Sequence, residues 1–172
     1  MENNVWMTDA EYGLVTSKVP IVCVDLVISR RGKRVSEDYW NNADILLIKR
    51  KTDYERGKWC LIGGRQRKGE NLRYCIQRHA SDLEIEVEPV YPFDPNFPAW
   101  VNDADQDRTK HPTALVYPVE ITKGNPRQEG EEFDGINWFP VDSLPEIMGY
   151  DHTREVLKTI GQLRKFNAKL KH

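Results

Sequence analysis

A glycine pair followed by basic residues is the part of this sequence most suited to chemistry. Gly63 and Gly64 follow a short apolar run, and Arg65, Arg67 and Lys68 come directly after them. Paired glycines let backbone amides approach a ligand closely, because no side chain stands in the way. A helix after this loop would add its positive N-terminal end, and the arginines would add charge-assisted hydrogen bonds. The segment therefore predicts phosphate binding, with a tight solvated turn as the alternative for the loop alone.

Several carboxylates and one histidine are candidates for metal binding or acid–base chemistry. Asp25 interrupts an apolar run, where an unpaired carboxylate would be costly, so we expect it to contact a ligand or a buried partner such as Arg50. His79 and Asp82 are three residues apart, and each is either a metal ligand or an ordinary helix side chain. The acids of residues 129–134 are typical of a solvated acidic loop.

The elements that would position these residues follow from the periodicity. Strands are predicted where β-branched residues run together or alternate, in residues 19–29, 43–51, 59–62, 84–90, 113–121 and 136–139. The first is a continuous apolar run, typical of a strand buried on both faces. Pro118 indicates an edge strand or a bulge. From Asn71 to Leu83 apolar residues recur every three or four positions, which predicts an amphipathic helix, and residues 143–166 are expected to hold one or two more. The pattern predicts an α+β fold.

The bulk composition predicts one globular domain spanning residues 1–172, with 39% hydrophobic and 30% charged residues. The net charge of -2 argues against a nucleic-acid partner. No apolar run reaches the ~20 residues that cross a bilayer, so no membrane partner is expected. Cys23, Cys60 and Cys75 are isolated, and the first residues lack a secretory pattern, which together predict free thiols and a cytoplasmic location.

The spacing of Gly64, Glu70 and Arg78 resembles the opening of the Nudix box. In that family the residues matching Glu70 and Arg78 connect the loop to the helix. The resemblance implies a Nudix fold, a mixed β-sheet sandwiched between helices. It also implies a small-molecule nucleotide ligand and a homodimer.

The second half of the box departs from the family pattern. His79 stands where the family has a glutamate, Asp82 and Leu83 replace two consecutive glutamates, and Ile85 replaces a glycine. Those glutamates hold divalent metal, because hard cations prefer carboxylate oxygens. One carboxylate and one histidine make a poorer magnesium site and would suit manganese or a softer metal better.

The chain is also similar to the GDP-mannose mannosyl hydrolases, a Nudix branch with fewer box carboxylates, over residues 11–157. The resemblance lies in EYGLVTSKVPIVCVDLVI, ILLIKRK, WCLIGGRQRKGENL and INWFPVDSL. It implies attack at the sugar carbon of a nucleotide sugar, with one Mg²⁺ or Mn²⁺ ion.

This resemblance implies roles for individual residues. The substrate would be bound by Asp25, Arg50, Gly63, Gly64, Arg65 and His152. The metal ligands would be the Gly64 carbonyl, Glu70, Asp82 and Glu132. Arg65 would offset the negative charge on the leaving diphosphate, and Glu70 would be a second catalytic residue. Phe133 stands in the place of the family's general base, a histidine, and leaves Glu131, Glu132 or Asp134 as substitutes.

Three functions stay open. The chain is a metal-dependent hydrolase of a nucleoside diphosphate derivative, a catalytically silent Nudix-like module that binds such a ligand, or a phosphoanhydride hydrolase in which Glu70, His79 and Asp82 hold metal. We favour the first, with a nucleotide sugar as substrate.

Overall fold

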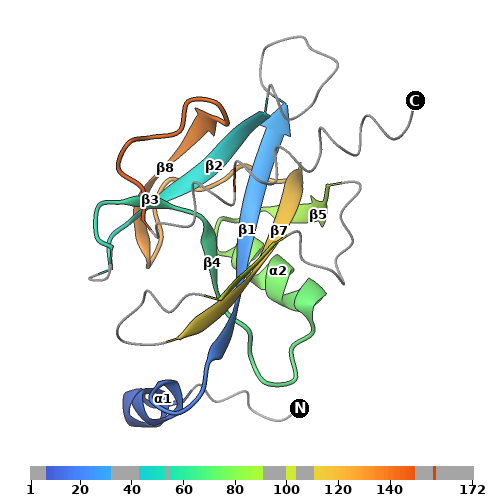
Figure 1. The fold of residues 1–172 in the computed structure, drawn as a ribbon. Helices are drawn as coiled ribbons and strands as arrows, with labels where there is room; N and C mark the ends of the chain where they lie inside the picture. Colours follow the sequence, from blue (N-terminus) through green and yellow to red (C-terminus); the bar gives the residue numbers. More distant parts are fainter. Residues whose placement is uncertain are drawn as a thin grey trace.

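The computed structural model describes residues 7–31, 43–52, 55–90, 100–103, 111–149 and 157. Within them the elements are α1 (Asp9–Thr16), β1 (Ile21–Arg31), β2 (Ala43–Arg50), β3 (Trp59–Cys60), β4 (Ile62–Arg65), α2 (Leu72–Ser81), β5 (Glu86–Pro89), β6 (Trp100–Asp103), β7 (Pro112–Lys123) and β8 (Phe133–Pro140). All eight strands join one mixed sheet with the central order β3-β2-β1-β7-β5 (Figure 1). The predicted α+β class is confirmed.

Strand β1 lies at the centre of the sheet. One edge pairs in parallel with β7, and the other edge pairs antiparallel first with β4 and then with β2. Successive side chains of a strand point to opposite faces. Leu26 and Ile28 lie in the core that contains the buried residues of α2, whereas Val27 lies in a second core with Leu157. The prediction of a strand buried on both faces is therefore confirmed for this half of β1.

Helix α2 begins at a side-chain cap, because Asn71 Oδ1 accepts a hydrogen bond of 2.9 Å from the Tyr74 amide. The predicted apolar stripe faces the sheet, where Cys75, Ile76, His79 and Ala80 are buried. The helix ends at Ser81, and Glu84 takes a positive φ of 61°. That left-handed residue turns the chain into β5, so the helix and the strand are both slightly shorter than predicted.

Pro118 lies in β7, which has neighbours on both edges, so the prediction of an edge strand or bulge at this residue is wrong. One edge pairs with β1, while the other pairs with β6 as far as Val116 and with β5 from Val119 onward. The Pro118 carbonyl accepts from the Val90 amide at 3.0 Å. Both backbone groups of a strand residue face the same edge. The side of Pro118 that lacks an N–H therefore faces the junction between β6 and β5, where no hydrogen bond of the sheet requires a donor.

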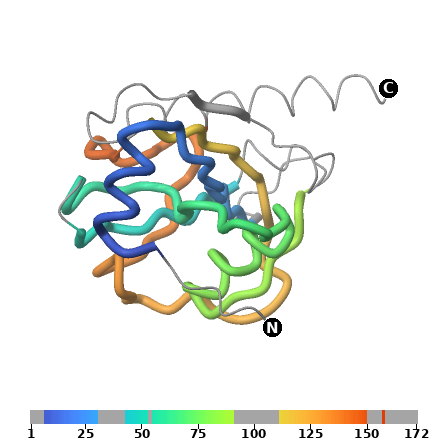
Figure 2. Tube along the Cα trace, turned by 90° about the horizontal axis from the view of Figure 1, so that it is seen from below, coloured from blue at the N-terminus to red at the C-terminus, as the bar shows by residue number. Residues whose placement is uncertain are grey.

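Helix α1 was not expected from the apolar pattern, and none of its residues is buried. It forms through a capping box, in which Thr8 accepts from the Glu11 amide and Glu11 accepts from the Thr8 amide. It lies at the end of the molecule where β1 starts (Figures 1 and 2). Neither described helix is long and apolar enough to cross a membrane.

Candidate functional site

The glycine loop, residues 63–70, is held between β1 and α2. In β4, Gly63 pairs with Asp25 and Gly64 pairs with Val24. A Cβ on Gly63 would overlap the Asp25 carboxylate and the Val24 carbonyl, and one on Gly64 would lie 3.1 Å from His79 Cε1. The first position therefore requires glycine for the close approach of the two strands. The Asp25 carboxylate lies over the loop, as its predicted role in ligand contact requires.

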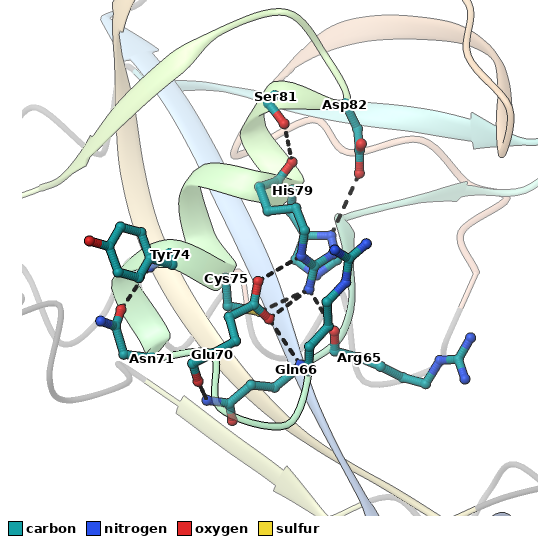
Figure 3. Close-up of polar contacts among 11 residues, drawn as sticks. Arg65, Gln66, Glu70, Asn71, Tyr74, Cys75, His79, Ser81 and Asp82 are labelled. Carbon is teal, nitrogen blue, oxygen red and sulfur yellow. Dashed lines mark hydrogen bonds and ion pairs between the residues drawn. The ribbon is translucent and has the colours of Figure 1, made fainter. Parts of the chain in front are cut away.

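Glu70 and Arg78 join the loop to the helix. Arg78 donates to the Glu70 carboxylate from Nε at 2.7 Å and from NH2 at 2.9 Å, and it also donates to the Arg65 carbonyl at 2.8 Å (Figure 3). The Arg67 amide donates to Glu70 at 2.9 Å. Burial alone would raise the pKa of Glu70, but the hydrogen bonds and charge of Arg78, with the Arg67 amide, outweigh it and lower the pKa to about 2. Glu70 is thus ionised and its two oxygens are engaged.

His79 contributes a nearly buried imidazole to this region. Its side chain is 6% exposed, and Nδ1 lies 3.8 Å from Asp82 Oδ2 (Figure 3). Burial, followed by the positive charge of Arg78, lowers the pKa of His79, although Asp82 opposes the shift. The imidazole is therefore neutral near physiological pH. Leu83, at a glutamate position of the family, is fully buried in the core.

A cavity of about 690 Å³ opens beside this loop. Most of the predicted site residues line it together, namely Asp25, Arg50, Gly63, Gly64, Arg65, Asp82, Glu131 and Glu132. Glu70 is not among the lining residues, because it faces Arg78 and the Arg67 amide. His152 lies outside the described residues, so its predicted role stays a prediction. The glycine loop and the acidic residues before β8 thus border one space, although they are far apart in the sequence.

Asp25, Arg50 and Glu132 lie near one another, around the buried thiol of Cys60. Burial raises the pKa of Cys60 to about 12, Arg50 opposes this shift, and the charges of Asp25 and Glu132 add to it. β2 and β8 produce this arrangement, since Arg50 is paired with Phe133 and the Lys51 amide donates to the Glu132 carbonyl at 3.0 Å. Phe133 itself is 2% exposed. Its side chain belongs to the core, so Phe133 itself cannot supply a base.

Two cavity residues, Tyr12 and Arg127, were not predicted from the sequence, whereas Arg67, also in the lining, was named with the glycine loop. The Tyr12 ring lies under the Arg65 guanidinium, with 3.9 Å from Cζ to the ring centroid. The capping box at Thr8 would have predicted the helix that carries Tyr12. Arg127 comes from the loop before β8, where its amide donates to the Leu83 carbonyl at 3.1 Å. Nothing in the local sequence predicts that long-range contact.

The donor set does not fit a preformed site for Mg²⁺ or Mn²⁺. Among the described residues, no group of three or more His, Cys, Asp or Glu side chains is placed to hold a metal ion. Glu70 is engaged by Arg78, and Leu83 lies in the core. At the C-terminal end of α2 the remaining candidate metal ligand is Asp82, whose side chain is 57% exposed and faces His79.

Comparison with known proteins gives the family of this chain. A family model described as the NUDIX domain matches residues 25–160. No curated protein sequence matches the chain. Among solved structures it is similar to a MutT NUDIX hydrolase from Burkholderia pseudomallei, with 27% identity, a TM-score of 0.63, and coverage of 83% of this chain and 99% of that one.

Two more distant structures share the fold. One is a UDP-X diphosphatase, with 17% identity, a TM-score of 0.58, and coverage of 91% of this chain and 72% of that one. The other is the NUDIX domain of Shewanella oneidensis NrtR in complex with ADP ribose, with 17% identity, a TM-score of 0.59, and coverage of 91% and 99%. Because the family model matches well over half of its residues, the protein belongs to the NUDIX domain family.

Proposed function

We propose that the protein hydrolyses a nucleoside diphosphate derivative, and that its substrate class is the nucleotide sugars. One observation carries the proposal: the glycine loop, several arginines and two exposed acids, Glu131 and Glu132, line one cavity of about 690 Å³. That volume lies within the range of ordinary small-molecule sites. The similar UDP-X diphosphatase and the ADP-ribose complex of the NrtR domain are compatible with a nucleoside diphosphate ligand.

The residues around the cavity suggest a division of roles. Asp25 and Arg50, on neighbouring strands, would bind the nucleoside or sugar, while Arg65 and the Gly63–Gly64 backbone would bind the diphosphate. Glu70 would act as a positioning residue, since its carboxylate fixes the loop rather than facing the cavity. His152 stays a candidate substrate contact.

Hydrolysis at carbon needs a base and a stabilised leaving group. Glu131 or Glu132 would accept a proton from water as the water oxygen bonds to the sugar carbon. The bond from that carbon to the diphosphate oxygen breaks, and the nucleoside diphosphate leaves with the electron pair. Arg65 would bind the negative charge that the leaving group gains. No step is assigned to a metal, because the donors described above do not form a preformed metal site.

Product analysis in water enriched in ¹⁸O tests the proposal. The protein would be incubated with GDP-mannose, other nucleotide sugars, ADP-ribose and dinucleotides, each with Mg²⁺, with Mn²⁺ and with chelator. Label in the free sugar, beside unlabelled nucleoside diphosphate, supports attack at carbon. Label in a phosphate means phosphoanhydride cleavage and contradicts this assignment. Loss of turnover in Glu131→Gln and Glu132→Gln together, with substrate still bound, would support the base assignment.

A ligand-binding module without turnover is the second candidate. Two observations favour it: Phe133 is buried where the resemblance places a base, and Leu83 is fully buried where it places a metal carboxylate. The cavity and its arginines serve this function equally well, because binding alone requires them. Saturable nucleotide binding without product under any metal condition would select this candidate.

A further inference from the structure

The charged groups around the cavity are unlike those of a metal-centred phosphate site. Hard divalent cations are held by several carboxylate oxygens. Here the described lining contains five arginines, Arg50, Arg65, Arg67, Arg78 and Arg127, against four carboxylates. Arg78 is committed to Glu70, which is outside the lining. With Arg78 set aside, the lining still offers four arginines, beside the four carboxylates, to a diphosphate.

Two of these arginines, Arg65 and Arg67, belong to the glycine loop, and each is held by a different part of the fold. Arg65 is at the end of β4, is paired with Cys23 of β1, and lies over the Tyr12 ring. The amide of Arg67 is bound by the Glu70 carboxylate at 2.9 Å. Their backbones are thus tied to β1 and α2, so less conformational entropy is lost when their guanidinium groups bind an anion.

Arg127 lines the same cavity and comes from the loop between β7 and β8. Its amide donates to Leu83 at the end of α2, its NH1 lies 3.7 Å from Glu84 Oε1, and its Cζ lies 6.0 Å from the centre of the Phe133 ring. Its side chain is 37% exposed, whereas its Nε is buried with no hydrogen-bond partner among the described residues. Arg127 therefore lies beside Phe133, on the lining of the cavity that the glycine loop also borders.

We propose that Arg65, Arg67 and Arg127 bind the diphosphate of the ligand in place of divalent metal ions, so that ligand binding needs no metal. Guanidinium groups suit this role because they are always charged and can offer two parallel hydrogen bonds to phosphate oxygens. The inference rests on the proposed diphosphate ligand, but it concerns binding and makes no claim about turnover.

Calorimetric titration of the full chain tests the inference. Inorganic pyrophosphate and GDP would be titrated in EDTA and again in Mg²⁺, with guanosine as the matched ligand that lacks the diphosphate. We expect pyrophosphate and GDP to bind in EDTA, with a dissociation constant within about threefold of that in Mg²⁺. No binding of pyrophosphate in EDTA, or affinity that falls more than tenfold on chelation, would overturn the proposal.

Single variants identify the residues responsible. Arg65→Gln, Arg67→Gln and Arg127→Gln should each weaken pyrophosphate and GDP binding about tenfold or more, which corresponds to losing one charge-assisted contact. Arg73→Gln is the matched control, because Arg73 is exposed and paired with Glu88 outside the cavity. Circular dichroism confirms that each variant is folded. Cavity variants that bind pyrophosphate like the control variant would contradict the assignment.

The labelled-product experiment separates this inference from the proposed function. Metal-independent binding with no product in any metal condition would leave the arginine site standing and remove the hydrolase assignment. Product formation together with ligand binding that requires Mg²⁺ would support the hydrolase assignment and overturn the arginine site.

Discussion

Replacing Glu70 with glutamine should lower the stability of the domain measurably. The Glu70 side chain is 10% exposed and accepts two hydrogen bonds from Arg78 and one from the Arg67 amide. Lowering its pKa from 4.5 to about 2 corresponds to on the order of 3 kcal/mol of folding free energy at pH 7. An amide has one oxygen and no charge, so it loses most of this contribution. We expect the free energy of unfolding to fall by about 2–3 kcal/mol, or roughly 5–10 °C in Tm.

The pH dependence tests the reasoning behind that magnitude. Because the pKa of Glu70 is lower in the folded state, its contribution is complete above the unfolded pKa of 4.5 and is lost as the pH falls towards 2. Urea unfolding should therefore show that the difference in unfolding free energy between wild type and Glu70→Gln is smaller at pH 3.5 than at pH 7 by on the order of 1 kcal/mol. The control is Glu88→Gln, an exposed partner of Arg73, with an expected change below about 0.5 kcal/mol. A gap under about 1 kcal/mol at pH 7, or one that does not change with pH, would refute the argument.

Three further outcomes are expected. Gly63→Ala should destabilise the domain by roughly 3 kcal/mol or more in urea unfolding, because the alanine Cβ would meet the Asp25 carboxylate and the Val24 carbonyl. Gly13→Ala, where the added Cβ has nothing within 4 Å, should not destabilise it, and equal effects of the two variants would contradict the packing argument. Tyr12→Leu should change the unfolding free energy by less than about 0.5 kcal/mol, because α1 buries no residue, yet it should raise KM or the pyrophosphate Kd about three- to fivefold. An unchanged affinity would show that the Tyr12 ring does not position Arg65. Cys60 is buried and its pKa is raised to about 12, so it should resist alkylation in the folded protein at pH 8 and react once urea unfolds the chain, as measured by mass spectrometry. Rapid modification of Cys60 in the folded state would contradict its burial.

Local patterns were sufficient to predict the elements that carry the site. The continuous apolar run in residues 19–29 predicted β1, and the three-and-four spacing after Asn71 predicted α2. Both signals come from residues close in sequence, where periodicity records which face is buried. The resemblance to the GDP-mannose mannosyl hydrolases supplied Asp25 and Arg50 as candidates, and the structure brings both to the same cavity.

The errors and omissions concern contacts between distant segments. Pro118 indicated an edge strand, but the break between β5 and β6 that accommodates it depends on how two other segments pair. Arg127 and Tyr12 both line the cavity, although Arg127 lies 62 residues after Arg65 in the sequence and Tyr12 lies 53 residues before it. The resemblance implied two roles for Glu70, metal binding and a connection to Arg78, and in the structure its oxygens face Arg78.

The end of α2 and the loop that carries Arg127 are coupled through the backbone. The Arg127 amide donates to the Leu83 carbonyl, and the Gly124 backbone lies so close to Glu84 that a Cβ would be 2.5 Å from the Glu84 carbonyl oxygen. Segments joined in this way open to solvent as one cooperative unit, with amide protons that exchange at similar rates. Fraying of the last helical turn would therefore carry Arg127 away from the cavity. A ligand that engages Arg127 would in turn slow amide exchange at the end of α2.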